Sequence, residues 1–306
     1  MALTLRKTPP TSFGGSRPAT AVEVAPEGAL AATRTAAGQA FVHAFAPLAA
    51  GALVPGIAEA NLRNPAAVAD AVRSALDQVS PKKSDITLIV PDWSTRVFVL
   101  DFDSLPNRPA ETISVLRFRL RKMVPLDVET AAVSYQVLPE LESGTVRVLA
   151  TVMPGTILAE YETAVRAAGY EPGAVMPSSL AALASVVSPE PALTVNLAAN
   201  ALTTSVIQGD DLLLFRTVDL PTDNAARVGE VQRSIAVAVA WFEDHLKVAP
   251  RQLYYSGGVD VREFSRAIQD AGLSVEEIAP TPTTGGVTPV GPIGFAGVTG
   301  ALAGAA

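Results

Sequence analysis

A strand-turn-strand segment over residues 193–207 carries the first candidate chemistry of this chain. Apolar residues alternate in its first strand, and the small residues at 198–200 predict a turn before the second strand. In folds that grip ATP with such a hairpin, the first strand ends in an aspartate with a glycine shortly after it. Those places hold Asn196 and Ala198 here. The segment therefore has the outline of a phosphate-binding hairpin without its acidic residue.

A second candidate is the turn Ser256-Gly257-Gly258, which lies between a predicted strand at 253–255 and a predicted helix at 261–271. Glycine lets a backbone approach a ligand closely, and a helix N-terminus offers free N–H groups to an anion. Such a turn also connects strands to helices without any ligand. Glu230 and Arg233, one turn apart on the longest predicted helix, suit a ribose and base, or an exposed ion pair between themselves.

Two further groups of charged residues could serve a site or could be ordinary surface residues. Asp92, Asp101 and Asp103 lie close in sequence, but nothing around them indicates the polar cleft that paired-carboxylate catalysis needs. We interpret them as a surface or turn cluster. The predicted helix at 111–123 carries arginines and a lysine around an apolar side, which suits an acidic lipid surface, a partner or plain solvation.

Composition excludes several classes of function. The 306 residues are 49% hydrophobic and 17% charged, which is typical of a globular protein. A net charge of -7 without a dense basic cluster argues against a nucleic-acid partner. The absence of cysteine excludes disulfides, thiolate catalysis and zinc–sulfur sites, and two distant histidines argue against a histidine metal site or triad. We therefore expect no metal site. The uncharged stretches 40–58 and 287–306 contain prolines and glycines, and neither is expected to span a membrane.

The periodicity of apolar residues predicts an α/β protein with a tail at 1–16 and a linker at 189–191. Asn64 is a suitable N-cap for the first helix, with Pro65 at its first position. Residues 94–153 read as a self-contained unit in the order strand, helix, strand, strand. Helices are expected from residue 65, and at 111–123, 157–168, 179–187, 222–247, 261–271 and 294–303.

Six segments, in the same order along nearly the whole chain, resemble those of the PilM family of type IV pilus assembly proteins. That family belongs to the actin-like ATPase superfamily, with FtsA, MreB and the heat-shock chaperones. The segments are PGIAEANLRNPAAVADAVRSAL (55–76), ITLIVPDWSTRVFVLDFDSLP (86–106), ISVLRFRLRKMVPLDVETAAVSYQVL (113–138), YETAVRAAGYEPGAV (161–175), GEVQRSIAVAVAWFEDHLKVAPRQLYYSGGV (229–259) and FAGVTGALAG (295–304).

The resemblance implies an actin-like (ribonuclease H-like) fold of two α/β domains with a small inserted α+β subdomain. The first domain would comprise 17–93, 154–190 and 292–306. The inserted subdomain would be 94–153 and the second domain 191–291.

The resemblance also implies two phosphate loops, and both depart from the family pattern. In the first, Glu23 keeps a carboxylate, but Ala25 replaces a glycine and Pro26 lacks an N–H. In the second, the neutral Asn196 cannot hold hydrated Mg²⁺ as an aspartate would, and Ala198 adds a Cβ. We therefore expect a pseudo-ATPase without a required cofactor. Weak binding of ATP or ADP with Mg²⁺ stays open, because the possible nucleoside-binding residues are better preserved: Glu230, Arg233, Ser256, Gly257 and Gly258.

Members of the family are cytoplasmic and reach the inner membrane only through partners. The resemblance implies a scaffold that binds the cytoplasmic tail of a PilN-type membrane protein, contacts other pilus platform or motor proteins, and self-associates. Its expected peptide groove lies between the first domain and the inserted subdomain, without assigned residues. Two alternatives stay open: a cytoplasmic component of a type II secretion platform, and a small-molecule kinase of the same superfamily.

Overall fold

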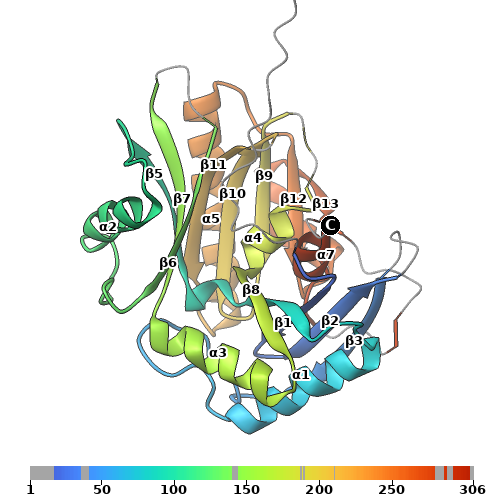
Figure 1. Ribbon diagram of the computed structural model, residues 1–306. Coiled ribbons are helices and arrows are strands. Elements are labelled where there is room, and N and C mark those ends of the chain that lie inside the picture. Colours follow the sequence, from blue (N-terminus) through green and yellow to red (C-terminus); the bar gives the residue numbers. More distant parts are fainter. Residues whose placement is uncertain are drawn as a thin grey trace, which may run out of the picture.

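The computed structural model describes residues 17–35, 41–139, 144–186, 188, 190–209, 211–279, 286–287 and 292–303, so the predicted tail at 1–16 lies outside the described residues. Two five-stranded sheets with their helices form the body of the molecule, and a smaller three-stranded unit packs beside them (Figure 1). Within the described chain, no helix combines the length and apolar character needed to cross a bilayer.

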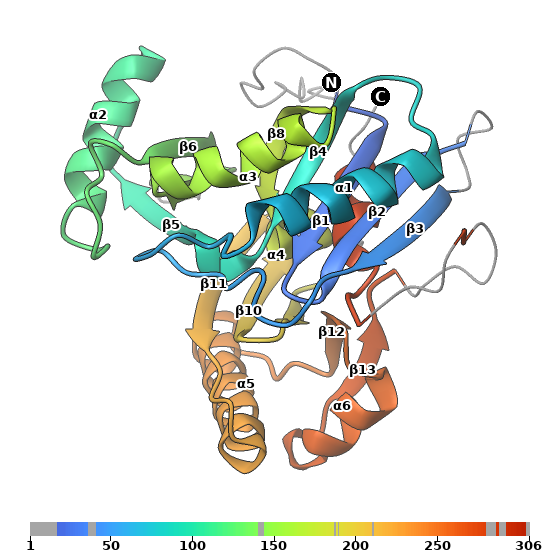
Figure 2. The same ribbon diagram turned by 90° about the horizontal axis from the view of Figure 1, so that it is seen from below.

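The first domain is a five-stranded sheet with helices on both faces. Its strand order is β3 (Phe41–Pro47), β2 (Gly28–Arg34), β1 (Thr20–Ala25), β4 (Asp85–Val90) and β8 (Glu171–Pro177). The first three strands are antiparallel, and β4 and β8 run parallel to β1. Helices α1 (Pro65–Val79) and α3 (Gly155–Ala167) cover one face (Figure 2), and α4 (Ser178–Leu183) and α7 (Ala296–Ala303) pack on the other.

The second domain repeats this arrangement. Its strand order is β11 (Asp211–Asp219), β10 (Ala201–Gln208), β9 (Ala192–Leu197), β12 (Gln252–Gly257) and β13 (Ser274–Glu277), again antiparallel for three strands and parallel for the last two. The outer face of the sheet packs on α5 (Asn224–Leu246) and α6 (Val261–Ala267). The two sheets therefore share the same strand order and strand directions. The sequence contains no fixed-period repeat that would predict this similarity.

The alternation of the strands directs polar side chains into the space between the two domains. In β9, Val195 packs in the core under α5, and Asn196 faces the other way. In β1, Val24 belongs to the core under α1, whereas Glu23 faces α4 and α7. Apolar side chains pack under helices on both faces of the first sheet and on the α5 face of the second, and each sheet also presents a polar group toward the other domain.

The inserted unit has a small core of its own. It consists of β5 (Arg96–Phe102), α2 (Pro109–Leu120), β6 (Ala132–Val137) and β7 (Val146–Met153), in the antiparallel order β5-β7-β6. Leu116 and Leu120 of α2 pack with Leu100 and Val148 of the sheet. The short 3-10 turn η1 (Asp92–Ser94) connects β4 to this unit, and β5 lies beside β11 of the second domain.

The start of α1 agrees with the sequence. Asn64 caps the helix by accepting a 3.1 Å hydrogen bond from the Ala67 N–H, and Pro65 occupies the first turn. By contrast, β8 is absent from the sequence-based expectation, because it contains Pro172, Gly173 and Pro177. An edge strand tolerates proline, since one side of it needs no ladder hydrogen bonds, and β8 is the edge strand beyond β4.

Candidate functional site

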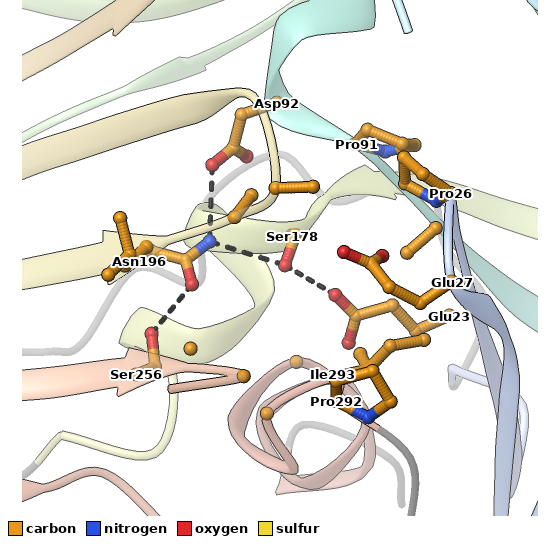
Figure 3. A pocket seen from close by; sticks show the side chains of 18 of the residues that line it. Glu23, Pro26, Glu27, Pro91, Asp92, Ser178, Asn196, Ser256, Pro292 and Ile293 are labelled. Carbon is orange, nitrogen blue, oxygen red and sulfur yellow. Dashed lines mark hydrogen bonds between the residues drawn. The ribbon is translucent and has the colours of Figure 1, made fainter. Parts of the chain in front are cut away.

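A cavity of about 250 Å³ lies between the two domains, at the carboxyl ends of strands from both sheets (Figure 3). Such a volume is smaller than the roughly 300–1,000 Å³ of typical ligand pockets. The first domain supplies lining residues from β1, from the turn after β4, and from α4 and α7, and the second domain supplies them from β9 and β12. The lining includes Glu23, Ala25, Pro26, Asp92, Ser178, Asn196, Ala198, Ser256, Gly257, Gly258 and Arg227.

Asn196 occupies the centre of a hydrogen-bond network at this cavity. Its side-chain N–H groups donate to Asp92 Oδ2 at 3.2 Å, Ser179 Oγ at 2.9 Å and Ser178 Oγ at 3.3 Å. Its carbonyl oxygen accepts a 2.9 Å hydrogen bond from Ser256 Oγ. The register of the sheet explains the last contact, because Asn196 pairs with Ser256 across β9 and β12. The amide thus joins both domains with its donors and acceptor satisfied.

Asp92 is the second member of this network, and it is buried. One carboxylate oxygen accepts a 2.9 Å hydrogen bond from the backbone N–H of Ser179. The other accepts from the hydroxyl groups of Ser179 and Thr203 as well as from Asn196. Burial raises the pKa of Asp92, and these hydrogen bonds oppose the increase. Of the expected surface or turn cluster, Asp92 does lie in a turn, but its side chain is buried, so the expectation of a surface position is wrong for it. Asp101 and Asp103 are exposed.

Glu23 is the other buried carboxyl group of the cavity. Its Oε1 accepts a 2.5 Å hydrogen bond from Ser178 Oγ, while Oε2 has no hydrogen-bond partner and lies against Gly297 of α7. Burial raises the pKa of Glu23 to about 7, with a smaller contribution from the negative charge of Asp92. Near neutral pH, Glu23 is therefore partly protonated, unlike an exposed glutamate.

The glycines of the Ser256-Gly257-Gly258 turn make close contacts with the chain itself. A Cβ at Gly258 would overlap the carbonyl group of Pro292, and a Cβ at Gly294 would lie 2.8 Å from the Gly257 nitrogen. The segment entering α7 is thus packed directly onto the turn. This packing uses the closeness of approach that only glycine permits.

The structure brings most of the sequence-predicted site residues together. Seven of them line the cavity: Glu23, Ala25, Asn196, Ala198, Ser256, Gly257 and Gly258. Glu230 and Arg233 are not among its lining residues. They form a 2.5 Å ion pair with each other on α5, in which Arg233 is 70% exposed. The sequence allowed either contacts to a ribose and base or an exposed ion pair, and the structure contains the i,i+3 ion pair.

Sequence reasoning did not identify Asp92, Ser178, Ser179, Thr203 and Arg227 as members of this site. A usable signal existed for Asp92, since it follows the buried strand β4, and residues at the carboxyl ends of parallel strands lie at the ligand-binding edge of a sheet. Arg227 donates a 2.8 Å hydrogen bond to the carbonyl of Ala198 and fixes the hairpin turn. Among the described residues, no group of three or more acidic or histidine side chains is placed to hold a metal ion.

A second cavity, of about 170 Å³, lies between the first domain and the inserted subdomain. It is bordered by β6 and β8, each of which is one of the two edge strands of its sheet. Its lining residues are Val90, Thr95, Ala132, Val133, Ser134, Thr151, Met153, Leu158, Val175 and Pro177.

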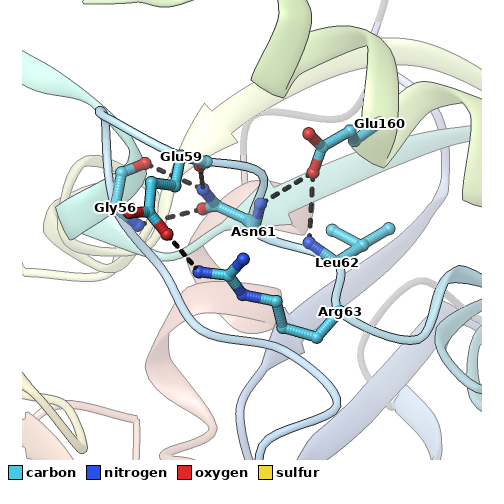
Figure 4. Close-up of polar contacts among 6 residues, drawn as sticks. All are labelled: Gly56, Glu59, Asn61, Leu62, Arg63 and Glu160. Carbon is cyan, nitrogen blue, oxygen red and sulfur yellow. Dashed lines mark hydrogen bonds and ion pairs between the residues drawn. The ribbon is translucent and has the colours of Figure 1, made fainter.

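The loop between β3 and α1 is fixed to α3 near this cavity (Figure 4). Asn61 is fully buried. Its side-chain oxygen accepts a 3.1 Å hydrogen bond from the Gly56 N–H, and its side-chain nitrogen donates a 2.9 Å hydrogen bond to the Gly56 carbonyl. Glu160 of α3 accepts hydrogen bonds from the backbone N–H groups of Asn61 and Leu62, at 2.8 and 3.1 Å. Asn61 also accepts a 2.6 Å hydrogen bond from Ser94, in the turn that leads into the inserted subdomain. The loop therefore holds the start of that subdomain in place.

Comparison with solved structures places this architecture among actin-like proteins. A chain of the PilM-PilN type IV pilus biogenesis complex is similar with a TM-score of 0.75 and 17% identity, covering 95% of this chain and 99% of that one. The cytoplasmic domain of EpsL, an inner membrane component of the type II secretion system of Vibrio cholerae, gives 0.50 at 11% identity and coverages of 77% and 80%. A Bacteroides thetaiotaomicron protein with an actin-like ATPase fold gives 0.50 at 10% identity and coverages of 85% and 90%.

These similarities show the fold, so the predicted actin-like α/β class is confirmed, as is the resemblance to PilM at the level of structure. No family model matches the sequence. No curated protein matches it in sequence either.

Proposed function

We propose that this chain is a non-catalytic actin-like scaffold of type IV pilus assembly that binds the cytoplasmic tail of a PilN-type inner-membrane protein. One observation supports the non-catalytic part: the side chain of Asn196 is fully engaged in hydrogen bonds that connect the two domains. Asn196 donates to Asp92, Ser178 and Ser179 and accepts from Ser256, so the two domains are connected by protein hydrogen bonds at the place where an actin-like ATPase holds its phosphates.

A magnesium nucleotide, which the actin-like fold implies, does not fit these residues. Asp92 already accepts four hydrogen bonds, and Glu23 is partly protonated near neutral pH. Neither is therefore a free carboxylate for Mg²⁺, which prefers charged oxygen ligands. Pro26 has no N–H to offer a phosphate, and Ala25 and Ala198 line the cavity with methyl groups. The residues at this cavity therefore do not support hydrolysis of a bound nucleotide.

The cavity between β6 and β8 supports the partner-binding part of the proposal. Each edge strand has one side without a strand partner in its sheet, and an extended peptide binds such an edge by main-chain hydrogen bonds. Apolar side chains of both units, including Val133, Leu158 and Val175, line the space between them and suit apolar side chains of a peptide. In this proposal the protein is cytoplasmic and reaches the inner membrane through the tail that it binds.

Calorimetric titration of the full chain with the N-terminal peptide of the PilN-type protein from the same organism tests the proposal. We expect saturable binding that Ser134→Arg weakens at least about tenfold, because the new side chain occupies the groove. Gln136→Arg is the matched control, since Gln136 lies two residues along β6 on the same face and is not a groove-lining residue. Absence of peptide binding, or rapid hydrolysis of magnesium ATP, would contradict the proposal.

A type II secretion platform is the second candidate, and the similarity of the fold to the cytoplasmic domain of EpsL favours it. The same titration with the cytoplasmic tail of a secretion-platform membrane protein separates the two roles. The kinase alternative has less support, since phosphoryl transfer needs a carboxylate base and intact phosphate loops. A phosphoryl-transfer screen with turnover would restore it.

A further inference from the structure

Helix α2 of the inserted subdomain exposes an apolar surface that its fold does not use. Phe118 is 67% exposed, Met123 43% and Val115 36%, and all three lie on the helix or in the turn that follows it. A surface helix normally has one apolar stripe, directed at the core. Here Thr112, Leu116 and Leu120 already form that buried stripe. The helix therefore has a second apolar face directed to solvent.

Cationic side chains surround this second face. Val115, Phe118, Arg119 and Lys122 follow the spacing i, i+3, i+4 and i+7, so they lie on one side of the helix and its C-terminal turn. Arg119 and Lys122 are exposed, and no hydrogen bond or ion pair of their side chains occurs within the described residues. The other cations nearby are engaged: Arg108 pairs with Glu111, Arg121 pairs with Glu129, and Arg117 donates to the Ala131 carbonyl.

The placement of α2 makes this face accessible to a flat surface. In both views the helix lies at the outer end of the inserted subdomain, away from α1, α5 and α7 (Figures 1 and 2). The local charge also contrasts with the rest of the molecule, because residues 108–123 carry five cations and one acidic residue in a chain whose net charge is -7. An acidic protein with one basic, aromatic-bearing helix has the charge distribution of an interfacial contact with anionic lipid.

We propose that the face formed by Val115, Phe118, Arg119, Lys122 and Met123 binds the surface of an anionic bilayer. Phe118 enters the interface between head groups and acyl chains, and Arg119 and Lys122 contact lipid phosphates. The proposal goes beyond the proposed function and rests on it only for the presence of a membrane nearby. Binding of this face would add a direct lipid contact to the attachment through a partner tail, so that two weak contacts act together.

Flotation of the full chain with lipid vesicles tests this proposal. We expect binding to vesicles of equal parts phosphatidylcholine and phosphatidylglycerol, little binding to phosphatidylcholine alone, and a strong decrease between about 0.1 M and about 0.5 M NaCl. R119E/K122E is expected to weaken binding at least about 25-fold, from about fivefold for each cation lost. F118S is expected to weaken it about tenfold through lost apolar burial.

Two control variants leave α2 unchanged. R251E/R262E makes the same change in net charge at exposed arginines of the second domain, and V237S removes an exposed apolar side chain from α5. Both are expected to bind vesicles like the natural chain. Equal binding to neutral and anionic vesicles, or equal losses in the control and α2 variants, would overturn the proposal. Loss of self-association or of tail-peptide binding in the α2 variants, with unchanged vesicle binding, would assign the face to a protein partner and would also overturn it. The tail-peptide titration is a separate measurement, so failure here leaves the scaffold proposal standing.

Discussion

The side-chain amide of Asn196 donates a 3.2 Å hydrogen bond to the carboxylate of Asp92, across the boundary between the two domains (Figure 3). An aspartate at 196 has no N–H with which to make this bond and would place a second carboxylate beside the first. The carbonyl oxygen of the same amide is also used, because it accepts a hydrogen bond from Ser256 Oγ. Asparagine is thus the residue type that this hydrogen-bond network requires at position 196.

Asn196→Asp is expected to destabilise the fold by about 3 kcal/mol near pH 8, since a partly buried hydrogen bond to the buried carboxylate of Asp92 is lost and a second negative charge is added beside it. Urea unfolding followed by tryptophan fluorescence measures the change. Asn200→Asp is the matched control, because it adds the same charge in the adjacent turn and also lines the cavity, and it should change stability by less than about 0.5 kcal/mol. Equal effects of the two variants would refute a specific role for Asn196.

The buried carboxyl group of Glu23 predicts a stability that falls with rising pH. Its pKa is raised from 4.5 to about 7 in the folded state, so the folded chain binds the proton more tightly than the unfolded chain. Stability from this group is complete below pH 4.5 and is lost as pH rises through 7, by about 3 kcal/mol in all. Burial also raises the pKa of Asp92, which acts in the same direction.

Urea unfolding between about pH 5 and about pH 8 checks this pH dependence. Glu23→Gln keeps an acceptor for Ser178 but cannot ionise, so the slope of stability against pH should flatten by the contribution of Glu23. Glu243→Gln, at an exposed position on α5, should keep the slope of the natural chain. A slope that is unchanged in Glu23→Gln would contradict the raised pKa.

Local patterns in the sequence were sufficient for most elements. Asn64 and Pro65 identify the start of α1, because capping chemistry depends only on neighbouring residues. The strand β8 was not predicted, because its prolines are tolerated only in an edge strand. Local sequence does not show which strand lies at the edge of a sheet. The strand order that the two domains share was not predicted either, because the inserted subdomain separates β4 from β8 in sequence.

The sequence predicted where the candidate site lies but not the hydrogen-bond network that Asn196 forms there. The hairpin pattern located Asn196, and the absence of a negative charge at this position was evident from its residue type. Its partners Asp92 and Ser178 come from segments about 100 and 18 residues away in sequence, and only the packing of two domains brings them together. A residue such as Asp92 looks like a turn aspartate until the three-dimensional structure supplies its four hydrogen bonds.

Gly258 is expected to be needed for packing. A Cβ there would overlap the Pro292 carbonyl, which is backbone and cannot move aside as a side chain could, so Gly258→Ala should cost about 2 kcal/mol or more. Gly229→Ala in α5 is the matched control, since nothing lies within 4 Å of its added Cβ and alanine favours a helix by up to about 1 kcal/mol. Thermal unfolding of both variants measures the contrast. An unchanged midpoint for Gly258→Ala would show that the turn is open, as a nucleotide site requires.

The ion pair between Arg147 and Asp211 is expected to fix the inserted subdomain to the second domain. Arg147 on β7 is buried, and it bonds both Asp211 and, at 3.4 Å, the carbonyl of Leu212 at the start of β11. The ion pair lies beside an apolar cluster that Leu138 and Leu212 share across the same boundary. Arg147→Ala leaves Asp211 without its cation and should cost about 3 kcal/mol.

The double variant Arg147→Met/Asp211→Leu tests whether the charges themselves stabilise this contact. Replacing both partners with apolar side chains of similar size leaves no unpaired charge, so it should cost less than about 1 kcal/mol and extend the neighbouring apolar cluster. Arg121→Ala is the control for a solvent-exposed pair, since Arg121 and Glu129 are 61% and 56% exposed, and it should change stability by less than about 1 kcal/mol. Hydrogen exchange should also increase in β5 and β11 for Arg147→Ala alone. Equal losses in the single and double variants would mean that side-chain packing, and not the uncompensated charge of Asp211, sets the cost.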